Sequence, residues 1–367
     1  MILKNLSIFL VLSIYVLVII VAYSEGPLIS VQSFILGLIG ILVITFIASS
    51  IAKSINLVDE ADGRRKDHKG AIPLTGGLIL FISIIYGAFV FGVNTFYIYI
   101  IASLLPIMII GTLDGLKAIE VPWTLRLVGQ ILASWIVILT TDIYVRDLGN
   151  LFGQGIVNLG GFGIPFTILG VVGLCNAFNM LDGRDGLAAS VAIVIVSSIF
   201  MLLFFQGTIF MMGLVIISSL IIFLLFNLGF FGVERKIFLG DHGSNALGHI
   251  IAWILIFLSQ EEKIITAISA IWFAFLPITD ALMTIARRLI ALRSPFLADR
   301  EHFHHILSNA GFSDRSVLII FIFISMITAT LAMISVHFNL KEYNLFYGYI
   351  TLLIIMLLLT GSRKKPS

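Results

Sequence analysis

The sequence predicts an all-α integral membrane protein, built as a polytopic bundle of about 11–12 transmembrane helices. Of its 367 residues, 59% are hydrophobic and only 11% are charged, less than half of the roughly 25% that is usual in soluble domains. The mean hydropathy is +1.12. So few charges could not cover the surface of a water-soluble protein of this length. The apolar runs also lack the alternation with period two that is typical of membrane β-barrels.

Each predicted helix is a run of about 20 mostly apolar residues, the length that crosses a bilayer. In chain order the runs are 6–24, 30–51, 74–93, 96–113, 122–141, 162–181, 187–205, 208–227, 245–259, 264–286, 316–336 and 345–361. The first run, within residues 1–29, is predicted to be an extra N-terminal helix that is retained, because it is long enough to span and no small-residue cleavage site stands out. Residues 30–367 form the main membrane domain. Segment 142–161 mixes apolar residues with glycines and is a candidate for a small β-hairpin on the outer surface.

The distribution of positive charge predicts the orientation of the bundle. With the N-terminus inside, only three of the 22 Lys and Arg residues fall outside, which leaves 19 on the cytoplasmic side. The three are Arg146, Lys263 and Lys341. Cytoplasmic loops of membrane proteins carry an excess of Lys and Arg. Both termini are therefore predicted to be cytoplasmic, together with the charged loops at 52–73, 114–121, 182–186, 229–244 and 287–315.

Net charge and cysteine usage exclude some partners and sites. The net charge of +2 argues against nucleic acid as a partner. The single cysteine, Cys175, cannot form a disulfide within the chain, and a cysteine-based metal centre is excluded. Because Cys175 lies in an apolar run, we expect a buried thiol.

The densest polar cluster, residues 176–186, closes one predicted helix and opens the next. It holds the amides Asn176 and Asn179, the carboxylates Asp182 and Asp185, and two glycines. Asn179 and Asp182 are three residues apart and would share a face of a continuing helix. Helix capping would explain one such residue, but this density favours a ligand site.

Asp241 stands next to Gly240 at the predicted inner start of a helix, and Gly243 follows two residues later. A carboxylate beside glycines at a helix N-terminus suits a site for a hard cation or a phosphate. For Asp241 taken alone, a plain helix cap is an equally good interpretation.

Residues 299–305 place His302, His304 and His305 beside Arg300. Three histidines suggest zinc, but the adjacent arginine favours phosphate or pyrophosphate. Histidine and arginine side chains can both donate hydrogen bonds to phosphate oxygens. A solvated His-rich loop is the alternative. Upstream, Arg287 and Arg288 either add to anion binding or only follow the positive-inside distribution.

Two carboxylates lie close to the membrane interior, Asp114 at the inner end of a helix and Asp280 inside a span. Buried carboxylates are costly unless they are paired or used. For Asp280, a pairing partner in the bundle and a role in the site are equally open.

The first inner loop carries Lys66 and His68 ahead of the sequence Pro73-Leu-Thr-Gly76-Gly77. Its basic residues suit an anionic lipid head group, although they could also only set the topology. Topology does not explain the Pro-x-x-Gly-Gly sequence.

Together, the clusters form a bipolar set on the cytoplasmic face. Carboxylate and amide oxygens can hold Mg²⁺, and Arg, Lys and His side chains can hold phosphates. This set fits phosphoryl transfer, in which catalysis consists mainly of positioning and charge neutralisation. Because the clusters lie at a membrane surface, we expect one substrate to be a lipid.

These residues resemble the motifs of the polyprenyl-phosphate N-acetylhexosamine-1-phosphate transferases. Among these, the chain is most similar to the bacterial enzymes that join N-acetylglucosamine-1-phosphate to undecaprenyl phosphate. The matching motifs, in family order, are His68-x-Gly-x-x-Pro73-x-x-Gly-Gly77, Leu113-Asp114 with Lys117, Asn176-Ala-Phe-Asn-Met-Leu-Asp-Gly-x-Asp-Gly186, Phe238-Leu-Gly-Asp-x-Gly-Ser244 and Asp299-Arg-x-His-x-His-His305.

The resemblance implies transfer of a HexNAc-1-phosphate, above all GlcNAc-1-phosphate, from a UDP-sugar to undecaprenyl phosphate. UMP would leave, and the product would start a cell-surface polysaccharide at the bacterial inner membrane. The implied cofactor is Mg²⁺, or Mn²⁺ in its place, held by Asn179 and Asp241, and the implied catalytic residues are Asp114, Asp182 and Asp185. The implied substrate-binding residues are Lys66, His68, Lys117, Asn176, Arg287, Arg288, Arg300, His302, His304 and His305. Whether the chain forms a homodimer stays open.

Three positions depart from the family pattern: Gly115 where a second aspartate is usual, Arg184 where an aliphatic residue is common, and His242 where a small residue is common. Each removes negative charge or adds positive or potentially positive charge. They favour, as one alternative, a divergent relative with low activity or with binding alone. A phospho-MurNAc-pentapeptide-type transferase is the alternative within the family, although the motif at 299–305 argues for the simple HexNAc group.

Overall fold

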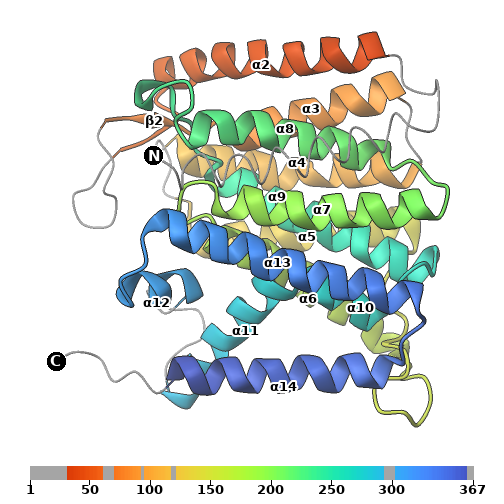
Figure 1. Ribbon diagram of the computed structural model, residues 1–367. Helices are drawn as coiled ribbons and strands as arrows, with labels where there is room; N and C mark the ends of the chain where they lie inside the picture. Colours follow the sequence, from red (N-terminus) through yellow and green to blue (C-terminus); the bar gives the residue numbers. More distant parts are fainter. Residues whose placement is uncertain (1–30, 61–69, 92–94, 117–120, 293–301, 362–367) are drawn as a thin grey trace.

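The structure, a computed structural model, describes residues 31–60, 70–91, 95–116, 121–292 and 302–361 (Figure 1). Within these ranges it confirms an all-α membrane protein: eight helices are long and apolar enough to cross a bilayer, or nine if the bent pair of α10 and α11 is one span. The helices are α2 (Val31–Ser54), α3 (Gly76–Phe91), α4 (Thr95–Gly115), α5 (Trp123–Thr141), α6 (Gly163–Leu181), α7 (Leu187–Phe205), α8 (Met211–Asn227), α9 (Gly240–Ile256), α10 (Ala267–Phe273), α11 (Phe275–Ile290), α12 (Phe303–Asn309), α13 (Asp314–His337) and α14 (Glu342–Gly361).

Most predicted runs from 30–51 onward coincide with helices, although α3 and α8 are shorter than the eight helices that could cross a bilayer, and the run at 6–24 lies outside the described residues. The predicted start of α9 is wrong, because the helix begins at Gly240 rather than at 245. Polar residues in its first turns lower the local hydropathy, although most of them are buried inside the bundle. Hydropathy therefore missed the helical turn that carries Asp241.

The predicted helix 264–286 is in fact two helices. α10 and α11 meet at Ala274 and are bent by 89°. Pro277 explains the break, because it has no N–H to donate to the carbonyl of Phe273 and its ring disfavours a continuous helix. The bend sends α11 obliquely across the bundle to contact α14 (Figure 1). The short helix α12 lies in a loop that hydropathy did not predict to be helical.

The candidate hairpin at 142–161 is reduced to one antiparallel bridge between Asp147 and Asn158. Beside it, the Val157 carbonyl accepts a hydrogen bond from Leu148 N–H at 2.9 Å. Glycines with positive φ follow closely on one another at 149, 153 and 155, and they turn the chain before strands can form. Among the described residues, the one sheet lies at the other end of the bundle, where β1 (Val58–Asp59) pairs antiparallel with β2 (Ile72–Pro73).

Helix α9 is the central helix of the bundle. It packs against α3, α4, α6 and, over smaller areas, α5 and α7. α9 and α7 are the spans most enclosed by protein, whereas α14 is nearly uncovered. A Cβ on Gly248 would lie 2.5 Å from the Cα of Cys175 on α6, so this glycine allows the two helices to touch. Cys175 is buried at this contact, as predicted.

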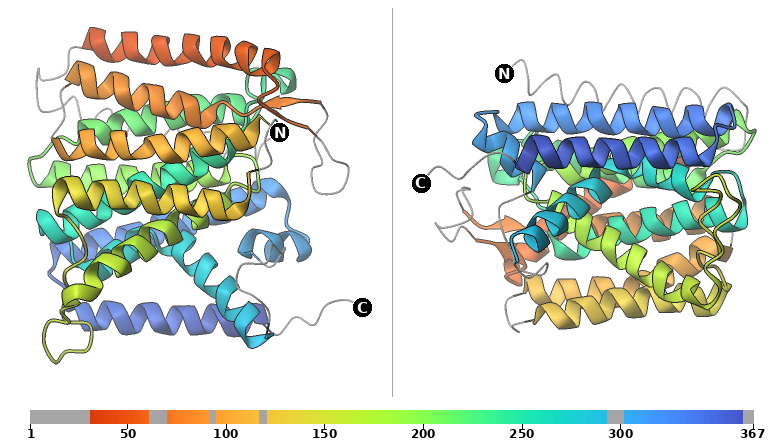
Figure 2. Two further views of the ribbon diagram at one scale, coloured as in Figure 1. Left: turned by 180° about the vertical axis from the view of Figure 1, so that it is seen from behind. Right: turned by 90° about the horizontal axis from the view of Figure 1, so that it is seen from below.

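The polar motifs are brought together at one end of the bundle. Helices α2, α4, α6, α8 and α11 all end on the side that carries β2 and α12 (Figures 1 and 2). The loops that follow these helices are the ones whose positive charge predicts a cytoplasmic location. The fold thus collects segments that are far apart in the sequence.

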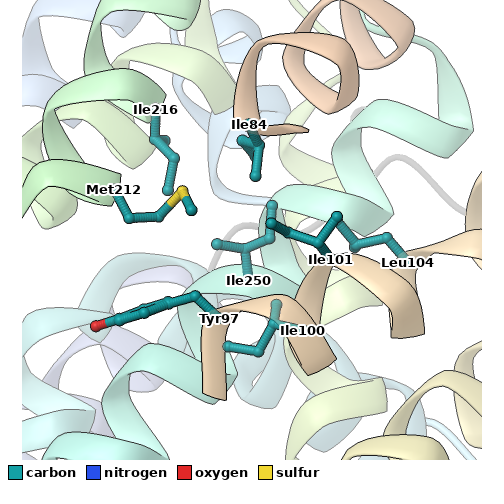
Figure 3. Close-up of a pocket in the computed structure, with 8 residues that line it drawn as sticks. All are labelled: Ile84, Tyr97, Ile100, Ile101, Leu104, Met212, Ile216 and Ile250. Atoms are coloured by element: carbon teal, nitrogen blue, oxygen red, sulfur yellow. The ribbon is translucent and has the colours of Figure 1, made fainter. Parts of the chain in front are cut away.

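The middle of the bundle is apolar by contrast. A small cavity between α3, α4, α8 and α9 has an apolar lining (Figure 3). Its lining residues are Ile84, Tyr97, Ile100, Ile101, Leu104, Met212, Ile216 and Ile250. About 15 Å of helix separates Leu104 from Asp114 on α4. The cavity is therefore separate from the charged end.

Candidate active site

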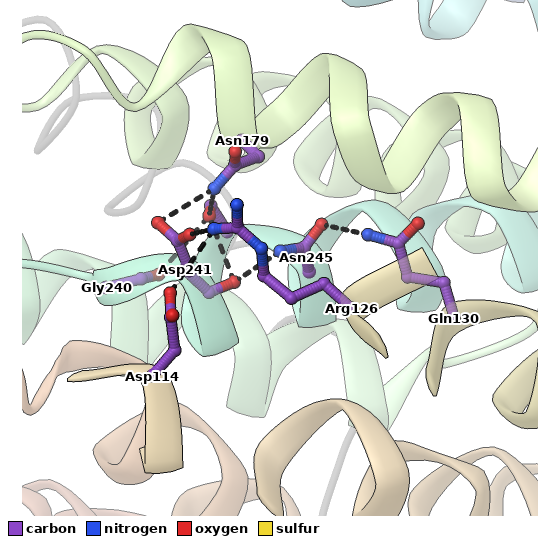
Figure 4. Close-up of polar contacts among 8 residues, drawn as sticks. Asp114, Arg126, Gln130, Asn179, Gly240, Asp241 and Asn245 are labelled. Carbon is purple, nitrogen blue, oxygen red and sulfur yellow. Dashed lines mark hydrogen bonds and ion pairs between the residues drawn. The ribbon is translucent and has the colours of Figure 1, made fainter. Parts of the chain in front are cut away.

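Charged and amide side chains from four helices meet at the charged end of the bundle (Figure 4). Asp114 lies in the last turn of α4, Arg126 in the first turn of α5, Asn179 in the last turn of α6 and Asp241 in the first turn of α9. Each residue sits at a helix end, so the bundle holds its backbone, and the side chains of Asp114, Arg126 and Asp241 stay partly exposed.

Asp241 is the centre of these contacts. Its Oδ2 accepts a hydrogen bond from Arg126 Nη1 at 2.6 Å, and its Oδ1 accepts one from Asn179 Nδ2 at 3.2 Å. The same Nη1 atom of Arg126 lies 3.3 Å from Asp114 Oδ2. The Asp241 carboxylate is thus directed to α5 and α6, and α9 has no side-chain cap. The interpretation of Asp241 as a plain helix cap is wrong.

The donor atoms suit a hard divalent cation. Asp114, Asp241 and Asn179 offer carboxylate and amide oxygens, and Mg²⁺ is commonly bound by one or two carboxylates together with substrate phosphates. The side chains of Asp114 and Asp241 are 27% and 39% exposed, so water and phosphate can reach them. The described residues contain no cluster of three or more His, Cys, Asp or Glu side chains that could enclose a metal. A cation here would therefore share its ligands with a phosphate.

One helical turn deeper, an amide layer formed by Gln130, Asn176 and Asn245 joins the same helices. Asn176 Nδ2 donates to Gln130 Oε1, and Gln130 Nε2 donates to Asn245 Oδ1, each at 2.8 Å. Asn245 Nδ2 donates to the backbone carbonyl of Asp241 at 2.7 Å. Each amide is three or four residues from Arg126, Asn179 or Asp241 on its own helix. The amide layer therefore fixes the rotation of α5, α6 and α9 beneath the site.

Replacing Gln130 by Met is expected to destabilise the protein by about 2 kcal/mol, because Asn176 and Asn245 would each lose a buried partner. Thermal unfolding in detergent measures the effect. The control is Thr140→Val on the same helix, whose exposed hydroxyl bonds only to its own helix and should matter by less than about 0.5 kcal/mol. Equal melting temperatures for the two variants would contradict the role of the amide layer.

Asp182 and Asp185 lie in the turn between α6 and α7. Asp185 pairs with Lys236, and Arg184 pairs with Asp314 in the first turn of α13. Burial raises the pKa of the Asp182 carboxyl well above its usual range, and the charges of Asp241 and then Asp185 raise it further. Helix α7 begins after Gly186 without a side-chain cap, so capping does not explain the two carboxylates.

The histidine motif is anchored by Asp280. Asp280 Oδ1 accepts a hydrogen bond from the backbone N–H of Phe303 at 2.7 Å, and Oδ2 lies 3.1 Å from His302 Nδ1. The buried carboxylate of Asp280 thus has a pairing partner, and that partner belongs to the predicted site. His302 and His304 are 6% and 1% exposed, so the alternative of a solvated loop is wrong for these two residues.

His304 links the histidine motif to the turn at 182–186. Its ring is parallel to that of His302, with centroids 6.0 Å apart, and its centroid is 4.1 Å from that of His305. A Cβ on Gly183 would lie 3.2 Å from His304 Nε2. Burial lowers the pKa of His304 to about 3, and the neighbouring His305 adds to this effect. His304 is therefore neutral at physiological pH.

This lowered pKa predicts that acid destabilises the protein. Below the unfolded-state pKa of about 6.5, the unfolded chain binds a proton that the folded protein does not take up until the pH approaches 3. Stability is thus lost as the pH falls from 6.5, by about 2 kcal/mol at pH 5. The melting temperature of the wild type should fall more steeply between pH 7 and 5 than that of His304→Gln, with His337→Gln as the control. Parallel curves for wild type and His304→Gln would contradict the prediction.

The remaining predicted residues divide into two groups. Arg288 is only 3% exposed, and half-buried Arg287 donates from Nε to the carbonyl of Met283 at 3.1 Å. The positive-inside distribution explains a basic residue in a cytoplasmic loop, but it does not explain why the Arg288 side chain is buried. The predicted residues that lie outside the described ranges are Lys66, His68, Lys117 and Arg300.

The three departures from the family pattern change packing and ion pairing around the site. A Cβ on Gly115 would lie 2.8 Å from Leu57 Cδ1 and 3.2 Å from Leu74 Cδ1, so leucines fill the space beside it. The charge of Arg184 is paired with Asp314. His242 is 1% exposed and packs against α4, where a Cβ on Gly111 would lie 2.7 Å from its own Cβ. None of the three displaces Asp114, Asn179 or Asp241 from the site.

The Pro-x-x-Gly-Gly sequence holds the start of α3 against the start of α9. Gly76 and Gly77 donate their N–H groups to the carbonyls of Phe238 and Leu239, each at 3.0 Å. A Cβ on Gly77 would lie 2.6 Å from the backbone nitrogen of Gly243, two residues after Asp241. Close backbone contact, rather than topology, explains the two glycines.

Sequence reasoning missed Arg126, Gln130, Asn245 and Lys236. Arg126, Gln130 and Asn245 could have been found from the sequence, because polar residues recur every four positions within two apolar spans. On α5 these are Arg126, Gln130 and Ser134, and on α9 they are Asp241, Asn245 and His249. Spacing by four places polar side chains on one helix face. In a membrane helix, such a face is expected to point into the bundle.

Comparison with known proteins agrees with this geometry. Residues 96–259 match the family model described as glycosyl transferase family 4, and this range contains Asp114, Arg126, Asn179 and Asp241. An undecaprenyl-phosphate α-N-acetylglucosaminyl 1-phosphate transferase from Escherichia coli is 33% identical over 320 residues, which cover 85% of this chain and 84% of the relative.

Proteins with the same name from two other bacteria extend the similarity. The one from Yersinia pestis is 33% identical over 296 residues, 79% of each chain. The one from Haemophilus influenzae is 30% identical over 320 residues, 86% of this chain and 89% of the relative. Similarity of this extent, over nearly the whole of both proteins, shows that the chain belongs to the undecaprenyl-phosphate N-acetylglucosaminyl 1-phosphate transferase family, within glycosyl transferase family 4.

Proposed function

We propose that the protein is an Mg²⁺-dependent transferase that moves GlcNAc-1-phosphate from UDP-GlcNAc to undecaprenyl phosphate and releases UMP. The observation that carries this proposal is the convergence of Asp114, Asn179 and Asp241 at one end of a membrane bundle, with Arg126 among them. The printed name of the relatives, which match the chain over most of its length, supports the same acceptor and sugar.

The bond changes are those of a phosphoryl transfer. An oxygen of the undecaprenyl phosphate forms a bond with the β-phosphorus of the UDP-sugar. The bond from that phosphorus to the bridging oxygen breaks, and UMP leaves with the electron pair. A phosphate monoester has a second pKa near 6, so the acceptor is mostly dianionic at neutral pH and needs no strong base. Asp114 would then serve to orient the acceptor.

The carboxylates of Asp241 and Asp114 and the amide of Asn179 would hold the cation. When bound, Mg²⁺ neutralises charge that develops on the phosphate oxygens and on the leaving UMP. The partial exposure of both carboxylates supports this proposal, because a soluble nucleotide sugar and a lipid phosphate could both reach them. Burial, together with the charges of Asp241 and Asp185, raises the pKa of Asp182, so its carboxyl would take up a proton more readily than an exposed aspartate.

The histidine motif would bind the pyrophosphate of the donor. His304 is neutral and buried, and neither of its ring nitrogens has a hydrogen-bond partner among the described residues. A neutral imidazole can donate one N–H to a phosphate oxygen that approaches the turn at 182–186. Asp280 holds the motif in place through His302 and the Phe303 N–H.

We further place the site on the cytoplasmic side of the bacterial inner membrane. This orientation rests on the excess of Lys and Arg in the loops at the charged end. The product would remain in the inner leaflet as the first lipid-linked intermediate of a cell-surface polysaccharide.

The test is a transfer assay with purified protein in detergent. With undecaprenyl phosphate, Mg²⁺ and labelled UDP-GlcNAc, we expect UMP and a labelled lipid in equal amounts. UDP-GalNAc and UDP-MurNAc-pentapeptide serve as competing donors, and chelation of the divalent cation should stop the reaction. Absence of turnover with every donor in the panel would overturn the proposed activity, and preference for the pentapeptide donor would overturn the choice of sugar.

A further inference from the structure

We propose that Arg126 is an exchangeable partner of the metal-binding carboxylates: a divalent cation displaces it from Asp114 and Asp241, and its guanidinium then binds a substrate phosphate. This inference rests on the proposed cation site. It adds that Arg126 exchanges its carboxylate partners for a phosphate during the reaction cycle. It follows from the position of one nitrogen atom.

The nitrogen Nη1 of Arg126 lies between the two carboxylates. It is 2.6 Å from Asp241 Oδ2 and 3.3 Å from Asp114 Oδ2. A cation held by both carboxylates would take the place between them that Nη1 occupies in Figure 4, so the guanidinium would have to move.

Charge balance favours this exchange. Asp114, Asp241 and Arg126 sum to a formal charge of −1, because two carboxylates face one guanidinium. Addition of a divalent cation changes the sum to +1. The carboxylates are then neutralised without Arg126, and the surplus positive charge favours an anion. Phosphate is the anion that both proposed substrates carry.

Arg126 has hydrogen-bond donors for a second partner. Both ion pairs use Nη1, so its Nε and Nη2 groups are not committed to either carboxylate. Its side chain is 35% exposed, which leaves room for the guanidinium to turn toward the aqueous boundary. Arginine binds phosphate through two parallel N–H donors, a geometry that lysine lacks.

Gly115, next to Asp114, adds no second carboxylate on α4. Leu57 and Leu74 approach Gly115, so a carboxylate next to Asp114 is replaced by apolar packing. Asp114 itself is paired with Arg126 on α5. The proposed cation site thus takes its two carboxylates from different helices, and one arginine contacts both of them but offsets only one of their two charges.

The first experiment measures cation binding without substrate. Mn²⁺ binding to the detergent-solubilised protein is followed by electron paramagnetic resonance for wild type, Arg126→Gln and Lys236→Gln. Lys236 is a matched control because it is a cation at the same end of the bundle that pairs with Asp185 instead. Arg126→Gln should tighten Mn²⁺ binding by about tenfold, and Lys236→Gln by less than about twofold. Equal shifts in the two variants, or weaker binding in Arg126→Gln, would overturn the exchange.

The second experiment uses the wild type, so it does not depend on a variant that folds. Phenylglyoxal modifies accessible arginines, and mass spectrometry reports the rate at each residue. Mg²⁺ should raise the modification rate of Arg126, and subsequent addition of UDP-GlcNAc or undecaprenyl phosphate should lower it. Arg146, which pairs with Asp142 at the other end of the bundle, is the internal control. An Arg126 rate that Mg²⁺ leaves unchanged or lowers would overturn the proposal.

The substrate that receives Arg126 is identified by kinetics of Arg126→Lys, which keeps the charge but loses the paired donors. A raised KM for undecaprenyl phosphate alone assigns the acceptor phosphate, and a raised KM for UDP-GlcNAc alone assigns the donor. Unchanged KM values for both would overturn the phosphate role. If wild-type protein turns over but Arg126 shows none of these effects, the exchange fails and the proposed activity stands. If the wild type neither binds Mn²⁺ nor turns over, the proposed activity itself fails.

Discussion

Asp241→Asn is expected to lower kcat for UMP release by about 10³-fold, because charge stabilisation in the transition state is commonly of that size. The substitution keeps the shape of the side chain and an oxygen that can accept the hydrogen bond of Asn179. It removes the negative charge that pairs with Arg126 and that would bind the cation. The transfer assay in detergent measures this loss at saturating substrates and Mg²⁺.

Asp142→Asn is the matched control for this variant. Asp142 is an exposed carboxylate at the far end of α5 and pairs only with nearby Arg146 among the described residues. It should retain wild-type kcat. Melting temperatures of both variants establish that the fold is intact. Full Mg²⁺-dependent turnover by Asp241→Asn would show that Asp241 is not a cation ligand.

Gly77→Val is expected to prevent the bundle from folding or to destabilise it by more than about 3 kcal/mol, the upper range of overpacking in a tight core. Even a Cβ at this position would lie 2.5 Å from His242 Cδ2 and 2.6 Å from Gly243 N. The backbone nitrogen cannot move aside, because it belongs to the helix that carries Asp241. Activity should be lost together with the melting transition.

Gly173→Val on α6 is the control, because a Cβ on Gly173 meets no atom within 4 Å. This variant should behave as wild type in size-exclusion chromatography and in thermal unfolding, apart from the small intrinsic cost of a β-branched residue in a helix. Gly77→Ala should fall between the two. A stable, active Gly77→Val protein would contradict the close contact between α3 and α9.

Much of the fold was accessible from the sequence because lipid imposes a simple rule on helix length. The run 187–205 coincides with α7 residue by residue, since apolar residues fill it and glycines or polar residues bound it. The rule failed where burial in protein replaces exposure to lipid. The start of α9 carries Asp241, His242 and Asn245 inside the bundle, and hydropathy cannot distinguish such a turn from a polar loop.

Several residues that meet at the charged end were predicted from the sequence, but their pairings were not. Asp114, Asn179 and Asp241 were predicted, and the structure brings them together. Arg126 was missed because one arginine at a helix start also satisfies the positive-inside distribution. Pairing of Asp280 with His302 joins residues 22 apart, and a sequence does not specify the bend at Ala274 that allows it.

The amide layer has an evolutionary consequence. Gln130 donates to one asparagine and accepts from another, so each of the three side chains has a partner that cannot be satisfied by an apolar residue. A single substitution by an apolar residue leaves at least one amide donor or acceptor of the layer without its partner, and replacement of all three removes this cost. Related sequences should therefore tend either to keep the trio or to have replaced it as a unit, because the intermediates would have to pass through less stable proteins.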